Sequence, residues 1–452
     1  MLRWLTIFSL CTGAWATGAP PDVPHLVDAW IAAGRTPGLA VGIIEPDGEV
    51  RMHFGGVRRQ GDPAPLDEAT LFEIGSVSKV FTTLLLARLA DEGRVALSDP
   101  VDGLLPATVR LPVRGETPIT LEHLATHTSG LARMPSNFEP ADPANPYADY
   151  TVERLYDHLV EVGPGRAPGG EASYSNLGLG LLGHALALRE GTTYESLLLE
   201  RVCRPLGMDR TLCTPARGAD PTIASAHQGV RPIAGWDIPV LAGAGDVDST
   251  LPDLMRFAAA NLDRSDAPIP RALRRCHEAR VGGGSPGLRL GLGWHVSERD
   301  DRQVVWHNGL TGGFAAFLGL EPRAGRAVVV LANSNEPAVL DLGRYLLDFA
   351  DAPPEPYLPG EELVLADWLG TYRLPGQELR LEVLVEHDQL LARLTGQRAF
   401  AVFPASPGVL ESRAGAVRLV LEAGDGDVPP RVVLHQAKAR IAFEREPGGT
   451  PE

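Results

Sequence analysis

A serine and a lysine three positions apart, Ser76 and Lys79, stand in the segment FEIGSVSK at residues 72–79. With this spacing at the start of a helix, the two side chains lie on one face and within reach of each other. A serine hydroxyl becomes a good nucleophile only when a neighbouring group takes its proton. A lysine can be that base if burial or a nearby positive charge lowers its pKa. The pair therefore predicts nucleophilic chemistry at Ser76, with the Lys79 amine as the base.

Lysine is rare in this chain, which makes its use at position 79 informative. It occurs only at Lys79 and Lys438, although the chain has 41 lysine and arginine residues in total. An arginine would supply the same charge but stays protonated, so it cannot act as a base. The structural alternative is a capped helix, with Ser76 as its N-cap and Lys79 as a solvated charge. The scarcity of lysine and two further motifs favour the chemical interpretation.

The second motif is YSN, residues 174–176, which follows a Gly/Pro-rich loop and precedes an apolar helix. The phenol of Tyr174 could carry a proton between the nucleophile and a leaving group, and Asn176 could anchor a substrate carbonyl. The structural alternative is a helix cap made by Ser175 or Asn176.

The third motif is HNGLTGGF, residues 307–314, which we expect at the end of a strand. A glycine there lets a substrate approach the backbone closely. The structural alternative is a Gly-rich hairpin turn.

The elements that must position these motifs follow from hydrophobic patterning. Helical spacing predicts helices at residues 76–93, 120–131, 176–191 and 249–262, in the middle of the chain. A hairpin is expected around residues 45–48, and strand-like runs separated by turns follow from residue 290. This distribution predicts an α+β fold, in which an antiparallel sheet is flanked by helices and accompanied by a helical subdomain.

The length of 452 residues predicts a large domain with a smaller one appended to it. We expect the main domain at residues 23–350 and a Pro-rich linker at residues 351–362. Residues 363–452 contain short alternating strands and predict a small β-barrel-like domain, with Trp368 and Tyr372 in its core. Its scattered polar residues indicate no active-site chemistry.

The N-terminus has the pattern of a secretory signal peptide. Arg3 precedes an apolar stretch that ends in AWA at residues 14–16, and this stretch is too short to span a bilayer. We therefore expect residues 1–16 to be removed and the protein to be periplasmic or secreted. An ordinary buried helix is the alternative interpretation.

Charge and cysteine content exclude several classes of partner. The net charge of −16 and the lack of a basic run argue against nucleic acid as a partner. No Cys/His spacing resembles a zinc site, so we expect neither a metal nor an organic cofactor.

Cys203 and Cys213 could pair in an exported protein, but the sequence leaves their pairing open, as it does the oligomeric state. We expect Cys276 at the surface.

Together and in this order, the three motifs resemble those of the serine β-lactamase and penicillin-binding protein superfamily. FEIGSVSK is similar to the active-site motif of class C β-lactamases at every position. LATHTSGL at residues 124–131 and GDVDSTLPDLMRF at residues 245–257 resemble flanking segments of the family. The resemblance covers roughly residues 23–349, and the tail resembles a small lipocalin-like β-domain appended to some of these hydrolases.

This resemblance implies a role for each matched residue. Ser76 would attack the substrate carbonyl and become acylated, while Lys79 and Tyr174 would share the general-base and general-acid work. Asn176 would hold Lys79 and the amide side chain of the substrate.

The third motif would bind the substrate through His307, Asn308, Gly309 and Leu310. The backbone N–H groups of Ser76 and Leu310 would form the oxyanion hole.

One position departs from the family pattern. The third motif of class C enzymes usually opens with lysine, whose fixed charge binds a substrate carboxylate, and here it opens with His307. Histidine is mostly neutral near pH 7.

From the three motifs together, our first hypothesis is an exported class C-type β-lactamase. The second is a D-Ala-D-Ala carboxypeptidase, another D-amino-acid peptidase or an esterase of the same superfamily. The third is a non-catalytic binder of cell-wall fragments, against which the intact Ser76, Lys79 and Tyr174 argue.

Overall fold

The computed structural model describes residues 22–446, except for 116, 214–219, 265–268, 286, 300, 351–367, 387–388, 398–399, 407, 413–416, 423–429 and 437–438. The expected leader at residues 1–16 and the expected linker at residues 351–362 lie outside the described residues and stay predictions. Within the described residues, the helices are too short or too polar to span a bilayer.

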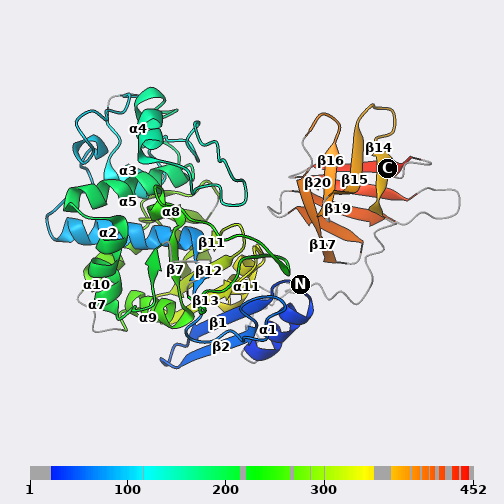
Figure 1. The fold of residues 1–452 in the computed structure, drawn as a ribbon, viewed down its shortest axis with the longest axis horizontal. Helices are drawn as coiled ribbons and strands as arrows, with labels where there is room; N and C mark the ends of the chain where they lie inside the picture. Colours follow the sequence, from blue (N-terminus) through cyan, green and yellow to red (C-terminus); the bar gives the residue numbers. More distant parts are fainter. Residues whose placement is uncertain are drawn as a thin grey trace, which may run out of the picture.

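The centre of the main domain is an eight-stranded antiparallel sheet (Figure 1). Strands from the beginning and the end of the domain are neighbours in this sheet, because the N-terminal hairpin pairs with a strand near residue 330. From one edge to the other the strands are β2 (Val50–Gly56), β1 (Gly38–Ile44), β13 (Arg326–Ala332), β12 (Ala315–Glu321), β11 (Arg302–Leu310), β10 (His295–Arg299), β9 (Leu288–Leu290) and β8 (Val281–Gly282).

The central strands are apolar along their whole length rather than alternating. β1 (GLAVGII) and β12 (AAFLGLE) are buried at every position, because helices cover both faces of the sheet. The edge strand β2 has no buried residue: exposed and half-buried positions alternate at its start, and its last residues are all half-buried.

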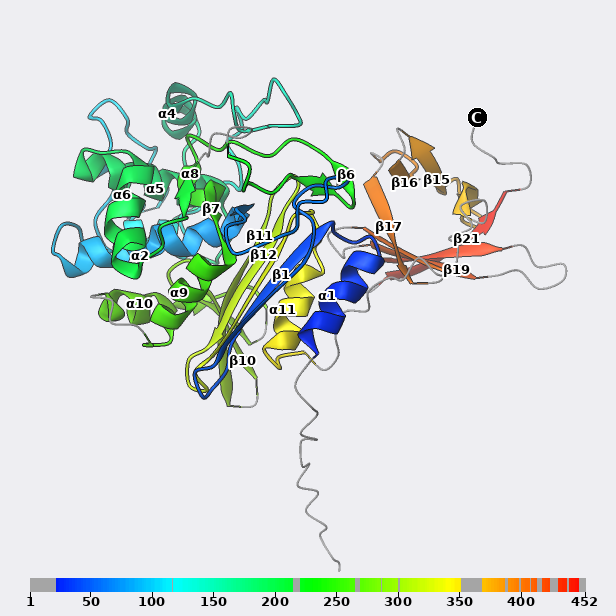
Figure 2. The ribbon, with the colours of Figure 1, turned by 60° about the horizontal axis from the view of Figure 1, so that its bottom comes forward.

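Two helices cover one face of this sheet, α1 (Val23–Ala32) and α11 (Val339–Leu346), as Figure 2 shows. Their apolar stripes, which include Val27, Trp30 and Leu342, pack against the side chains of β1, β12 and β13 that point to this face. The opposite face carries α9 (Leu251–Asn261) and the larger helical region of the domain.

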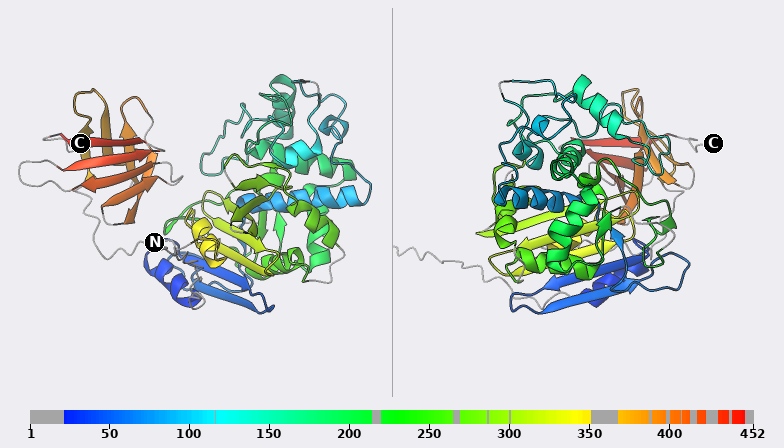
Figure 3. Two further views of the ribbon diagram at one scale, coloured as in Figure 1. Left: turned by 180° about the vertical axis from the view of Figure 1, so that it is seen from behind. Right: turned by 60° about the vertical axis from the view of Figure 1, so that its left-hand side comes forward.

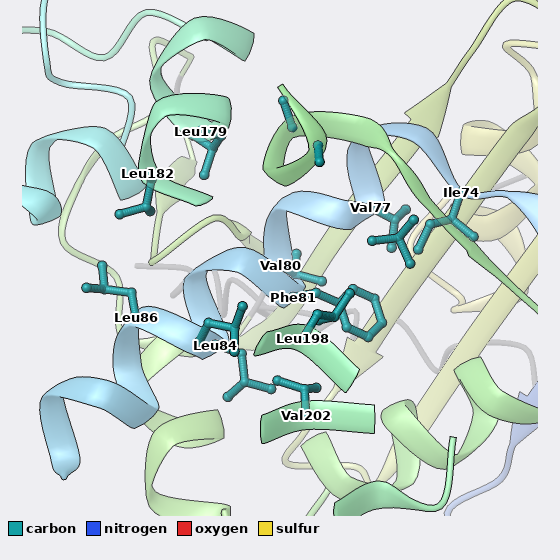
Figure 4. Packing of buried hydrophobic residues seen from close by; sticks show 14 of the residues in the cluster. Ile74, Val77, Val80, Phe81, Leu84, Leu86, Leu179, Leu182, Leu198 and Val202 are labelled. Carbon is teal, nitrogen blue, oxygen red and sulfur yellow. The ribbon is translucent and has the colours of Figure 1, made fainter. Parts of the chain in front are cut away.

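The helical region is built around α2 (Ser78–Asp91), whose residues are buried from Ser78 to Ala87. Figure 4 shows Val80, Phe81 and Leu84 of α2 packed among apolar side chains of neighbouring helices. The helices around it are α3 (Leu121–Ala125), α4 (Val152–Glu161), α5 (Asn176–Glu190), α6 (Tyr194–Leu198), α7 (Arg204–Leu206), α8 (Ala242–Gly245) and α10 (Pro270–His277), with single-turn segments η1 (Gly75–Val77) and η2 (Val101–Gly103) and a wide turn η3 (Leu199–Cys203) between α6 and α7.

Two small sheets complete the main domain. One is a three-stranded antiparallel sheet of β3 (Phe72–Glu73), β7 (Val247–Ser249) and β4 (Leu212–Cys213), whose strand β3 leads into η1. A two-stranded sheet is formed by β5 (His227–Gln228) and β6 (Arg231–Pro232).

The C-terminal strands close into an eight-stranded antiparallel barrel (Figure 3). Trp368 and Tyr372 are buried in its core, as expected, and the Tyr372 hydroxyl donates to the Trp368 carbonyl at 2.8 Å. The predicted α+β fold with a small all-β module after it is therefore confirmed. The barrel strands are β14 (Gly370–Arg373), β15 (Arg380–Glu386), β16 (Gln389–Leu394), β17 (Phe400–Ser406), β18 (Val409–Ser412), β19 (Val417–Glu422), β20 (Arg431–Gln436) and β21 (Ala439–Arg445).

The structure settles the state of the cysteines, which the sequence left open for Cys203 and Cys213, and corrects the expected position of Cys276. Cys203, Cys213 and Cys276 are all free thiols, so Cys203 and Cys213 form no disulfide. Cys276 is buried between α10 and α2, and its thiol contacts the Thr83 carbonyl, so its expected surface position is wrong. Burial raises the pKa of Cys276 to about 12, which makes a reactive thiolate unfavourable.

Candidate active site

Ser76 lies in the η1 turn, between the end of β3 and the start of α2. It is half-buried, whereas its neighbours Gly75 and Val77 are buried. Two hydrogen bonds fasten this turn to β7: the Ile74 N–H donates to the Val247 carbonyl at 3.0 Å, and the Val247 N–H donates to the Ser78 hydroxyl at 3.0 Å. The N-cap of α2 is Val77, so Ser76 precedes the helix rather than capping it.

Lys79 lies one turn further along and is fully buried. Its Nζ lies 2.8 Å from Ser76 Oγ and donates to the Ala244 carbonyl at 2.6 Å. Burial, and secondly the charge of Arg133, lowers the pKa of Lys79 well below its usual value. Both effects favour the neutral amine, whose lone pair can accept the serine proton. The solvated-lysine interpretation is therefore wrong.

Tyr174 lies against both of these groups. Its ring centroid is 4.9 Å from Lys79 Nζ, and its hydroxyl lies near the side chain of Ser76, a polar neighbour that acts against the rise of the Tyr174 pKa. Burial raises the pKa of Tyr174 above its usual value, so the phenol keeps its proton. The predicted helix cap is also present, because the Ser175 hydroxyl accepts from the Gly178 N–H at 2.9 Å. The YSN segment thus has a structural role through Ser175 and leaves Tyr174 beside Ser76.

Asn176 lies at the start of α5, near this pair but in contact with other residues. Its side-chain Nδ2 lies 3.6 Å from Met134 Sδ. Its Oδ1 is buried and has no hydrogen-bond partner among the described residues. The implied contact between Asn176 and Lys79 is not made, because the amine contacts Ser76 and Ala244 instead.

The third motif runs along the last residues of β11, next to the η1 turn. A Cβ added at Gly309 would lie 1.9 Å from the Ile74 carbonyl oxygen and 3.1 Å from the Ser76 backbone nitrogen. A Cβ added at Gly75 would lie 3.0 Å from the Leu310 backbone nitrogen. The two glycines therefore let the backbones of Ser76 and Leu310 come together, as two N–H donors of an oxyanion hole must.

We predict that Gly309→Ala lowers kcat/KM by about 100-fold, because the new methyl group meets backbone atoms that cannot yield and displaces β11 from Ser76. Gly282→Ala, in β8 of the same sheet, is the matched control, because a Cβ there would have nothing within 4 Å. Steady-state kinetics and thermal unfolding of both variants test this, and equal activity of the two would contradict it.

His307 lies inside β11 and is buried. Its Nδ1 is 2.7 Å from the Asn308 carbonyl oxygen, which can only accept, so Nδ1 carries the hydrogen. Its Nε2 is buried and has no partner among the described residues. Burial first, then the charges of His295 and Lys79, lowers the pKa of His307 well below its usual value. His307 is thus a neutral, buried group and supplies no positive charge to a substrate.

Sequence reasoning missed two histidines that contact residues of the site. His127 stacks on Tyr174 with ring centroids 4.5 Å apart, and His295 lies 4.9 Å from His307. His127 stands in LATHTSGL, which was interpreted only as a flanking segment, and its positive φ of 58° could not be inferred from sequence. Ala244, which binds the amine, was missed because a backbone carbonyl has no sequence signature. The described residues contain no cluster of metal-ligating side chains.

Comparison with protein-family models matches residues 23–352 to the model described as Beta-lactamase. The D-alanyl-D-alanine-carboxypeptidase/endopeptidase AmpH of Escherichia coli K12 is 32% identical over 299 residues, which cover 63% of this chain and 76% of AmpH. A β-lactamase of Pseudomonas fluorescens is 29% identical over 341 residues, which cover 66% of this chain and 89% of that enzyme.

Solved structures give a consistent result. One match is a β-lactamase/D-alanine carboxypeptidase from Yersinia pestis, with a TM-score of 0.61 and 26% identity. The matched region covers 68% of this chain and 90% of the Yersinia chain. A class C β-lactamase from Rhodobacter sphaeroides matches with a TM-score of 0.62 and 25% identity. This match covers 72% of this chain and 97% of the Rhodobacter chain. The octameric penicillin-binding protein homologue from Pyrococcus abyssi covers 93% of this chain at 22% identity and a TM-score of 0.64, a likeness of fold alone.

Proposed function

Since the chain belongs to the Beta-lactamase family, we propose that it is a serine hydrolase that opens β-lactam amides through an acyl-Ser76 intermediate. The observation that carries this proposal is the fully buried Lys79 amine, 2.8 Å from Ser76 Oγ and shifted toward its neutral form. A solvated lysine would be protonated at neutral pH and could not accept the serine proton.

In the acylation step, Ser76 Oγ bonds to the substrate carbonyl carbon and gives its proton to Lys79. The backbone N–H groups of Ser76 and Leu310 stabilise the negative charge that develops on the carbonyl oxygen. The C–N bond then breaks, and the leaving nitrogen takes a proton from the Tyr174 phenol, which recovers one from Lys79. In deacylation, water attacks the acyl carbon and gives a proton to Lys79 or Tyr174. The bond between the acyl carbon and Ser76 Oγ then breaks, and Oγ takes that proton to restore the hydroxyl.

We predict that Tyr174→Phe lowers kcat by about 10²- to 10⁴-fold with a smaller change in KM, because the ring remains and the proton carrier is lost. Tyr156→Phe is the control: its phenol lies on α4, 2.7 Å from His184, and takes no part in the proposed mechanism. Steady-state kinetics measure both variants. Wild-type kcat in Tyr174→Phe would remove the phenol from the mechanism.

A second candidate is a D-Ala-D-Ala peptidase of the same superfamily, because AmpH, which is 32% identical, is named as such a peptidase. The neutral His307 does not separate the two candidates, since a D-Ala-D-Ala peptide also ends in a carboxylate. The two candidates differ in the second step, because a lactamase releases the acyl group quickly and a peptidase is trapped by the same drug.

The functional test compares nitrocefin, a D-Ala-D-Ala peptide and a p-nitrophenyl ester as substrates. A lactamase turns over nitrocefin and is labelled by a fluorescent penicillin only transiently. Stable labelling together with peptide cleavage would replace our proposal with the second candidate, and ester hydrolysis alone would indicate an esterase. No labelling and no turnover would indicate a binding protein.

A further inference from the structure

The site described above has no cation at the position that opens the third motif. His307 is buried in β11, and its Nε2 has no exposed surface with which to meet a ligand. A carboxylate brought next to Ser76 therefore needs a positive charge from another element. A guanidinium close to Tyr174 provides one.

Arg133 lies in the loop between α3 and α4, and its backbone is tied to the second motif. The N–H groups of Asn176 and Leu177 donate to the Arg133 carbonyl at 3.0 and 3.2 Å. These bonds fix the position of Arg133 relative to Tyr174 without using its side chain.

The guanidinium of Arg133 lies over the Tyr174 ring, with Cζ 5.0 Å from the ring centroid. Lys79 Nζ lies 4.9 Å from the same centroid, so the guanidinium and the catalytic amine lie close to one aromatic ring. Arg133 is nevertheless an exposed residue, whereas Lys79 is fully buried. Solvent therefore reaches the Arg133 residue, whose guanidinium lies beside the ring that neighbours the Lys79 amine.

The charge of Arg133 is effective at the site. Burial lowers the pKa of Lys79 most, and the charge of Arg133 lowers it further. For His127, burial and the charges of Lys79 and His295 lower the pKa more than Arg133 does. Within the described part of the chain, no acidic side chain forms an ion pair with Arg133. An exposed guanidinium with no acidic partner among the described residues can bind an anionic ligand through two parallel N–H···O bonds.

We propose that Arg133 binds the carboxylate of the substrate and thereby takes over the role that lysine has at the position of His307 in class C enzymes. This inference rests on the proposed function, because it assumes that the ligand of the Ser76 site carries a carboxylate. It makes Arg133 the residue that sets specificity for anionic over neutral acyl donors.

The experiment must separate two effects of Arg133, because its charge also lowers the pKa of Lys79 and thus affects acylation of every substrate. We therefore measure binding without turnover, in the Ser76→Ala background, by titration calorimetry. The probes are benzylpenicillin, which carries a carboxylate, and its methyl ester, which does not. The ratio of their dissociation constants reports carboxylate recognition alone.

We expect Ser76→Ala to bind benzylpenicillin at least tenfold more tightly than the ester, and Arg133→Gln to remove most of that preference. Arg133→Lys, which keeps the charge but not the paired donors, should retain part of it. Arg271→Gln is the control for net charge: its side chain is 81% exposed and pairs with Asp91 at the far end of α2, about 20 Å of helix from Ser78.

An unchanged ratio in Arg133→Gln, or no preference for the carboxylate at all, would overturn the inference. Neither outcome depends on catalysis. The proposed function is tested separately, by turnover in the enzyme that keeps Ser76, so the failure of one is distinguishable from the failure of the other.

Discussion

Ser76→Ala is expected to lower nitrocefin hydrolysis by on the order of 10⁴- to 10⁶-fold and to abolish covalent labelling by penicillin. The protein should still fold, because Ser76 is half-buried and Lys79 keeps its hydrogen bond to the Ala244 carbonyl. Hydrolysis rates, intact mass after exposure to penicillin and thermal unfolding measure these effects.

Ser78→Ala is the matched control for this prediction. The Ser78 hydroxyl accepts from the Val247 N–H and is fully buried, so its removal leaves a buried donor without a partner. We expect Ser78→Ala to lose about 1–3 kcal/mol of unfolding free energy and to lower activity far less than Ser76→Ala does, because the bond from the Ile74 N–H to the Val247 carbonyl still holds the turn. Normal hydrolysis by Ser76→Ala would refute the mechanism.

Lys79→Arg is expected to lose nearly as much activity as Ser76→Ala, although it conserves the charge. A guanidinium stays protonated and cannot take the serine proton. It is also larger than the amine, which is fully buried and lies within hydrogen-bond distance of both Ser76 Oγ and the Ala244 carbonyl. Measured kcat/KM for nitrocefin should fall by about 10³-fold or more.

The chain offers a natural control, because Lys438 is its only other lysine. Lys438→Arg makes the same chemical change at a position more than 100 residues beyond the last motif in the sequence, and should leave kcat/KM as in the wild type. If Lys79→Arg kept most of its activity, the amine would not be the base.

The sequence was informative where chemistry depends on local spacing. Ser76 and Lys79 are three residues apart, and the structure places their reactive atoms 2.8 Å from each other. The α+β order of elements could likewise be inferred, because helical periodicity in the middle and strand-like runs at both ends persist over many residues. The exact start of α2 could not be inferred from the sequence. Ser76 lies in a single turn before the helix, and two hydrogen bonds to β7, about 170 residues away in the chain, hold this turn in place.

What the sequence could not provide depends on contacts between distant segments. The Ala244 carbonyl and the rings of His127 and His295 reach the site only through packing of α8, the loop after α3 and β10. Cys276 was misplaced for the same reason, because the polar residues that follow it gave no sign that α10 packs against α2.

The central claim is that a neutral Lys79 amine activates Ser76, and the pH dependence of acylation tests it most directly. The measurement is rapid quenching with benzylpenicillin between pH 5 and 10, followed by peptide mass spectrometry. Because burial and Arg133 lower the pKa of Lys79, the amine loses its proton at a lower pH than a solvated lysine, near 10.4. We predict an adduct on the peptide that contains Ser76, formed at a rate that rises with pH and reaches its plateau well below pH 10. An adduct elsewhere, or a rate that still rises toward pH 10 as for an ordinary lysine, would contradict the account.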